Sequence, residues 1–182
     1  YSFKNFPVLI ECVDIKKEND LTVDMRWWIS KNTGLIQLNP LIPLDVLYSE
    51  SHGSGTVGKL WSEHHSMFSQ FISDYNVGNV LEIGAGHGDL CRIYRREHKN
   101  AKWTIVDPNP KIESSHNVLV IKELFGSNFD LPNGIDTIVH SHLMEHLYEP
   151  KKLISDISSK LKVGDMHLFS IPQLEKMLEN KY

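Results

Sequence analysis

Residues 80–90 read VLEIGAGHGDL, and this stretch decides the fold of the chain. The apolar run from Asn79 to Ile83 predicts a buried strand. Three glycines follow at alternate positions, and a helical pattern begins at Asp89. Glycine permits a tight turn in which a ligand lies against bare backbone, and a helix N-terminus offers unpaired N–H groups and a positive dipole end. The stretch therefore predicts a strand, a turn and a helix that together bind an anionic or strongly polar group.

The spacing of the glycines separates two kinds of nucleotide ligand. The dinucleotide fingerprint has the form G-x-G-x-x-G, whereas the third glycine here, Gly88, comes one position early. The pattern also carries an acid, Glu82, two residues before the first glycine. An NAD-dependent oxidoreductase is therefore disfavoured and is kept as an alternative, as is a structural turn that binds no ligand.

The composition indicates a globular chain. Its 182 residues are 41% hydrophobic and 23% charged, and the formal net charge is −4 without any block of basic residues. Binding to a phosphate backbone needs a basic surface, so we expect no nucleic-acid partner. No apolar run is long enough to span a membrane, so we expect no membrane partner. The two distant cysteines, Cys12 and Cys91, suit a cytoplasmic location.

Strand and helix patterns alternate after the glycine turn. The further strands are predicted at 102–106, 118–121, 135–139 and 166–171. A helix is predicted to begin at Pro150, because proline fits the first helical turn. Such alternation predicts an α/β fold with a Rossmann-like, doubly wound parallel sheet over residues 79–182, whose ligands bind at the C-terminal strand ends.

Two further parts precede this domain. Residues 1–43 are predicted to form a small N-terminal β module. Its strand candidates are 7–13, 25–29 and 34–38. Residues 44–78 are predicted to hold a linking loop and an amphipathic helix, whose aromatic face carries His64.

Asp107 stands at the end of the second strand of the predicted sheet, beside the glycine turn. A carboxylate at this place can accept hydrogen bonds from both ribose hydroxyls of a nucleoside, as it does in dinucleotide folds. The alternative is an aspartate that only initiates a turn before Pro108. The glycine pattern upstream favours the ligand-binding interpretation.

These features together resemble class I S-adenosylmethionine (SAM)-dependent methyltransferases. The segment Asp136–His146 resembles the motif after the fourth strand of small-molecule methyltransferases, which ends in Glu-His. The resemblance implies SAM as cofactor, S-adenosylhomocysteine (SAH) as product and no metal, with Asp107 on the ribose and Leu124 and Phe125 beside the adenine. The residues assigned to the cofactor are Glu82, Gly84, Ala85, Gly86, Gly88, Asp107, Pro108, Leu124, Phe125 and His140. That family carries two more strands after the fifth, so we expect this sheet to be incomplete and the chain to be a fragment.

The same segment supplies the predicted catalytic residues. His146 is the predicted base that takes a proton from the methyl acceptor, because an imidazole titrates near neutral pH, and Glu145 is its alternative or its partner. A purely structural role for the Glu145–His146 pair stays open. His140, His142 and His146 also suggest a metal site, but their spacing departs from the H-x-H-x-D-H pattern, so no metal is predicted.

A narrower resemblance covers the residues before the glycine turn. The segments Gly34–Leu38 and Pro43–Tyr48, followed by a Ser/Gly loop and a His-containing helix, resemble the N-terminal part of sugar C-methyltransferases. That family binds zinc through cysteine pairs, whereas this chain has Ser30–Thr33 in their place, so the zinc module is predicted to be degenerate. The resemblance implies a small polar acceptor, first of all a nucleotide-linked or polysaccharide-bound sugar. Its predicted contacts are Tyr48, His52 and His64, with a hydrogen-bonded core histidine as the alternative for His64. A non-catalytic SAM-binding module is the alternative function.

Overall fold

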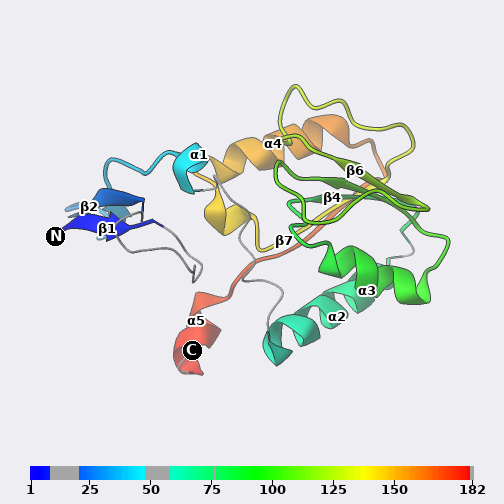
Figure 1. Cartoon of the computed structure of the whole chain (residues 1–182), viewed down its shortest axis with the longest axis horizontal. Coiled ribbons are helices and arrows are strands. Elements are labelled where there is room, and N and C mark those ends of the chain that lie inside the picture. The colour runs from blue at the N-terminus through cyan, green and yellow to red at the C-terminus, as the bar shows by residue number, and fades with distance from the viewer. Residues whose placement is uncertain (9–20, 48–57, 76, 181–182) are drawn as a thin grey trace. The chain divides into compact units, whose positions relative to one another are not determined.

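The computed structural model describes residues 1–8, 21–47, 58–75 and 77–180 (Figure 1). The chain divides into two compact units, residues 1–54 and 55–182. Two residues predicted to contact the acceptor, Tyr48 and His52, lie outside the described residues.

The first unit is a small antiparallel sheet followed by a short helix. Its elements are β1 (Ser2–Pro7), β2 (Thr22–Ile29), β3 (Ile36–Leu38) and α1 (Leu44–Leu47), with strand order β1-β2-β3. The predicted β module is confirmed, and its first described strand is Ser2–Pro7, which begins before the predicted stretch 7–13. This earlier segment forms a strand because it pairs antiparallel with β2, with Phe3 opposite Met25. Most of the stretch 7–13 lies outside the described residues.

The second unit is built on a five-stranded parallel sheet. Its strands are β4 (Asn79–Ile83), β5 (Lys102–Val106), β6 (Val118–Ile121), β7 (Thr137–Ser141) and β8 (Met166–Ser170). They lie in the order β6-β5-β4-β7-β8, and each neighbouring pair is parallel. The predicted α/β class and the Rossmann-like sheet are therefore confirmed. In this order the chain winds outward from β4 to one edge and then from β7 to the other.

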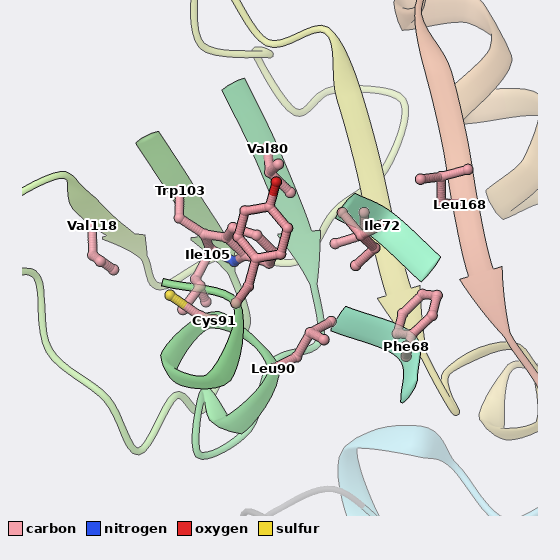
Figure 2. Packing of buried hydrophobic residues seen from close by; sticks show 11 residues of the cluster. Phe68, Ile72, Val80, Leu90, Cys91, Trp103, Ile105, Val118 and Leu168 are labelled. Carbon is pink, nitrogen blue, oxygen red and sulfur yellow. The ribbon is translucent and has the colours of Figure 1, made fainter. Parts of the chain in front are cut away.

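Helices cover both faces of this sheet (Figure 1). These are α2 (Lys59–Ser73), α3 (Asp89–Glu97) and α4 (Pro150–Lys160). The short 3₁₀ helix Met144–His146 follows β7, and α5 (Leu174–Glu179) follows β8 without any buried residue. Figure 2 shows α2 and α3 against one face, where Phe68 and Leu90 belong to the same buried cluster as Trp103. On the other face, Leu153 and Ile157 of α4 pack in a second cluster with Leu81. Burial of both faces explains why the adjacent β4 residues Val80 and Leu81 are both apolar, since each belongs to a different buried cluster.

The predicted strand bounds agree with the structure for β4, β5 and β6, whereas β7 lies two residues later than 135–139. Asp136 explains the shift, because its carboxylate accepts the backbone N–H groups of Gly78 and Asn79 at 3.2 and 2.9 Å. Asp136 thus links the start of β4 to the turn before β7 through its side chain. None of the helices in the described part of the chain has both the length and the apolar character of a membrane span.

Candidate active site

The strand order creates a switch point between β4 and β7, where ligands of open α/β sheets bind. The C-terminal ends of these two strands lead into residues 84–88 and residues 141–146, which we call the switch-point edge. The two segments touch, since a Cβ atom added to Gly84 would lie 3.2 Å from Cδ1 of Leu143. The sequence predictions for the cofactor and for the catalytic residues therefore meet at one edge of the sheet.

The glycine turn has the geometry that requires glycine. Gly84, Gly86 and Gly88 have φ values of 71°, 53° and 73°, in the left-handed region that side chains disfavour. A Cβ atom on Gly88 would lie 2.6 Å from Ile112, whereas one on Gly86 would meet no heavy atom within 4 Å. Gly88 is thus needed for packing at the start of α3, and Gly86 leaves bare backbone that a ligand can approach. Ala85 is half-buried and packs against the core.

Asp107 braces the glycine turn from the end of β5. Its Oδ2 accepts the N–H of Gly86 at 2.9 Å and its Oδ1 accepts the N–H of Asn109 at 2.7 Å, and the residue is 8% exposed. Each carboxylate oxygen has two lone pairs, so both oxygens can accept a further hydrogen bond. Asp107 can therefore accept one hydrogen bond from each of the two ribose hydroxyls, as its predicted role requires. Pro108 follows as an exposed residue.

Glu82 lies in the buried part of β4 instead of at its surface. Its Oε2 accepts the indole N–H of Trp103 at 2.7 Å, and the residue is 4% exposed. Burial raises the pKa of Glu82 to about 7, while the hydrogen bond from Trp103 acts in the opposite direction and the charge of Asp107 adds to the rise. The predicted cofactor contact of Glu82 therefore involves a carboxyl group that already has one partner within the fold.

The two residues predicted beside the adenine differ in their surroundings. Leu124 is 74% exposed, so its side chain is accessible. Phe125 is partly buried against the cluster under α4, with its ring centroid 5.3 Å from that of Phe129. Lys160 fixes this loop by donating to the backbone oxygens of Ser127 and Phe129 at 3.0 and 2.6 Å.

His140 is fully buried in β7. Its Nε2 lies 3.0 Å from Nε2 of His167 on β8, and its ring stacks on Phe169 with centroids 5.2 Å apart. Burial, followed by the neighbouring His167, lowers the pKa of His140 to about 4. The whole residue is enclosed, so its contact with the cofactor stays a prediction.

The carboxylate of Glu145 is paired with His142. Nδ1 of His142 lies 3.1 Å from Oε1 of Glu145, which is an i,i+3 contact across the 3₁₀ turn. His142 has a φ of 50°, in the left-handed region, and directly follows the end of β7. His146, the predicted base, is exposed at the end of the same turn. The structure thus brings Glu145 and His146 to the switch-point edge and adds His142 to them.

His64 reaches the same edge from α2. Its Nε2 lies 2.8 Å from Oγ of Ser141, and Ser170 donates to Ser141 at 2.9 Å. Its ring lies edge-on to that of His142, with centroids 4.7 Å apart. Burial, followed by the charges of His142 and His65, lowers the pKa of His64 to about 4. His64 therefore stands beside the other predicted residues as a neutral imidazole at neutral pH.

Sequence reasoning did not assign Ser141, Ser170 or Trp61 to the site. The Trp61 ring packs 4.8 Å from that of His142, and the two serines hold His64. The sequence offered two weak signals for these residues. Trp61 lies on the same helical face as His64, and Ser141 and Ser170 each end a parallel strand. Among the described residues, no group of three or more His, Cys, Asp or Glu is placed to hold a metal ion. The expected absence of a metal stays a prediction.

Solved structures that resemble this chain include methyltransferases of low sequence identity. The plantazolicin methyltransferase BpumL, in complex with a monoazolic desmethylPZN analog and SAH, is 16% identical with a TM-score of 0.51, over 65% of this chain and 50% of its own. Coclaurine N-methyltransferase, bound to N-methylheliamine and SAH, is 19% identical with a TM-score of 0.46, over 70% of this chain and 44% of its own. The chain thus spans about half the length of these proteins, and the likeness to BpumL shows the fold alone. A search of curated proteins by sequence gives no match.

A family model described as Methyltransferase domain matches residues 59–181, which is more than half of the chain. The matched range holds the whole parallel sheet, the glycine turn, Asp107 and the switch-point edge. This chain therefore belongs to the methyltransferase domain family.

Proposed function

We propose that the chain binds SAM and transfers its methyl group to a small polar acceptor, with a nucleotide-linked or polysaccharide-bound sugar as the first candidate. The observation that carries the proposal is the open backbone of Gly86 joined to the carboxylate of Asp107 at the switch point of a methyltransferase fold. The glycine turn holds the methionine part of SAM, and Asp107 holds the ribose. Leu124 and the loop at Phe125 lie beside the adenine.

The chemistry needs little more than positioning and one proton transfer. The sulfonium of SAM activates its own methyl group, so the protein must hold the acceptor in line with the leaving sulfur. A hydroxyl, or a C–H next to a keto group, must also lose its proton, for which imidazole is the suitable base near pH 7. The switch-point edge offers histidines for this step, with Glu145 and His146 as the residues predicted from the sequence.

The proposal of a sugar acceptor rests on the sequence resemblance of residues 34–48 to sugar C-methyltransferases. The similar proteins are named for acceptors of different chemical classes, since BpumL is called a plantazolicin methyltransferase and the second protein is coclaurine N-methyltransferase. An acceptor test must therefore include more than one chemical class.

Isothermal titration with SAH and with NADH tests the cofactor. We expect SAH to bind and NADH to give no heat, because the glycine spacing departs from the dinucleotide fingerprint. Binding of NADH without SAH would overturn the assignment.

Formation of SAH from SAM then tests the acceptor. The probes are a thymidine diphosphate-linked 4-keto-6-deoxyhexose, a catechol and a benzylic amine. Turnover of the sugar supports the proposal, whereas turnover confined to the catechol or the amine contradicts the sugar assignment. SAH binding without turnover of any probe favours a non-catalytic SAM-binding module.

A further inference from the structure

His142 has a hydrogen-bonding arrangement that fixes which of its ring nitrogens carries a proton. Nδ1 lies 3.1 Å from Oε1 of Glu145. A carboxylate accepts hydrogen bonds and does not donate them, so Nδ1 must carry the hydrogen. In the neutral ring Nε2 then holds the lone pair, and no residue in the described ranges forms a hydrogen bond with it. The ring therefore offers one unoccupied basic nitrogen.

The ring is also fixed in orientation. The Trp61 indole and the His64 imidazole lie edge-on to it, with centroids 4.8 and 4.7 Å away and interplanar angles of 70° and 86°. His64 is itself held by Ser141 at 2.8 Å. The backbone of His142 is tied to β8, because its N–H donates to the oxygen of Ser170 at 3.1 Å. A base that is held on three sides loses little entropy when it reacts.

The position of His142 connects this arrangement to the cofactor site. Its chain neighbour, Leu143, contacts the first glycine of the turn after β4, as the 3.2 Å distance from the Gly84 Cβ position shows. The side chain of His142 keeps an exposed fraction of 24%, so a small molecule can reach it. His142 also adopts a φ of 50°, and such backbone strain in a residue other than glycine is concentrated at functional sites.

We propose that His142 is the general base of methyl transfer and that Glu145 is its positioning residue. The inference rests on the proposed function. The proton passes from the acceptor hydroxyl or C–H to Nε2 of His142, and the electron pair left behind forms the bond to the methyl carbon of SAM. The C–S bond breaks with its electron pair retained by sulfur, which yields SAH. The imidazolium then returns the proton to water. This assignment gives His142 the role of base that the sequence pattern predicts for His146.

The charges around His142 are consistent with a neutral base. Burial lowers its pKa, Glu145 raises it, and His65 on α2 and His146 on the turn lower it further. His64, the other titratable group that packs against the ring from α2, has its own pKa lowered to about 4 and is uncharged at neutral pH. The ring is therefore ready to accept a proton at pH 7.

Long-range ¹H–¹⁵N NMR spectra of the imidazoles test the assignment without any acceptor. We expect His142 to carry its hydrogen on Nδ1 at pH 7, and its Nε2 signal to move when SAH is added. Glu145→Gln should release the ring to a mixture of tautomers. The exposed His116 is the control, and its signals should not respond to SAH or to Glu145→Gln. A hydrogen on Nε2 of His142 in the unaltered chain would overturn the proposal.

Kinetics with the keto-sugar probe separate a base from a packing residue. His142→Gln should lower kcat by roughly 10²–10⁴-fold, with KM and SAH affinity nearly unchanged. The control His116→Gln, which changes an exposed histidine, should retain most of the rate. A loss confined to His146→Gln, or a collapse of SAH affinity in His142→Gln, would contradict the assignment. If the unaltered chain binds SAH but leaves the sugar unmethylated, the acceptor proposal fails, and the NMR result alone decides the role of His142.

Discussion

At the scale of single residues, Asp107 joins the fold to the proposed function. Its carboxylate accepts one N–H from the glycine turn and one from Asn109. Asp107→Ala leaves both donors without that acceptor and removes the proposed ribose contact. We expect the free energy of SAH binding to weaken by roughly 1–3 kcal/mol, measured by isothermal titration. The control is Asp130→Ala, which changes an exposed aspartate. Unchanged SAH affinity in the Asp107 variant would remove this residue from the site.

The buried carboxyl group of Glu82 predicts a pH dependence of stability. Its pKa in the folded state is raised from 4.5 to about 7 by burial, against the opposing hydrogen bond from Trp103. A raised pKa gives stabilisation that is fully present below pH 4.5 and is lost as the pH rises through 7. Glu82→Gln removes this titration, so its free energy of unfolding should decline less over that range, by an amount on the order of 1–3 kcal/mol.

Denaturant unfolding at pH 4.5, 6 and 7.5, without ligand, measures this effect. Glu113→Gln is the matched control, because Glu113 is exposed. Parallel pH profiles for Glu82→Gln and the unaltered chain would show that the carboxyl group keeps its ordinary titration in the fold.

At the scale of elements, the sequence predicts a feature best when the feature depends on a single strand or a single turn. The apolar runs at 79–83 and 102–106 are buried on both faces, so pattern alone located β4 and β5. The pairing of Glu145 with His142 could not be predicted in this way. The pair forms at a histidine with a left-handed φ, and no pattern in the neighbouring sequence predicts that backbone conformation. The contact of His64 with Ser141 joins residues 77 positions apart and exists only once α2 has packed on the sheet.

The packing of α2 on the sheet gives a prediction for adjacent residues of one helix. Phe68 is 5% exposed and belongs to the buried cluster in Figure 2, whereas Met67 is 74% exposed. Phe68→Ala should destabilise the fold by about 3–5 kcal/mol through lost burial and an unfilled cavity. Met67→Ala should change stability by less than about 0.5 kcal/mol. Urea unfolding measures both, and equal losses would mean that α2 buries a different face.

At the scale of the whole molecule, the proposed cofactor site and the proposed base both lie in the second unit. Both buried clusters of the parallel sheet consist of residues between 68 and 168, and the family match covers 59–181. The first unit has its own three-stranded sheet and its own buried residues, Val8 and Ile42. Under the proposed function, the resemblance of residues 34–48 to sugar C-methyltransferases gives this unit a role in acceptor choice. We therefore expect the second unit to bind the cofactor and the first unit to influence which acceptor is methylated.

This separation predicts the behaviour of residues 55–182 expressed alone. They contain every strand of the parallel sheet, the glycine turn and Asp107, so they should fold and bind SAH. We expect a Kd within about threefold of that of the full chain, a difference of about 0.6 kcal/mol. The measurements are the thermal transition and isothermal titration with SAH, and turnover of the keto-sugar should be the property that is lost. A shortened chain that is folded but has lost SAH affinity would show that residues 1–54 take part in cofactor binding.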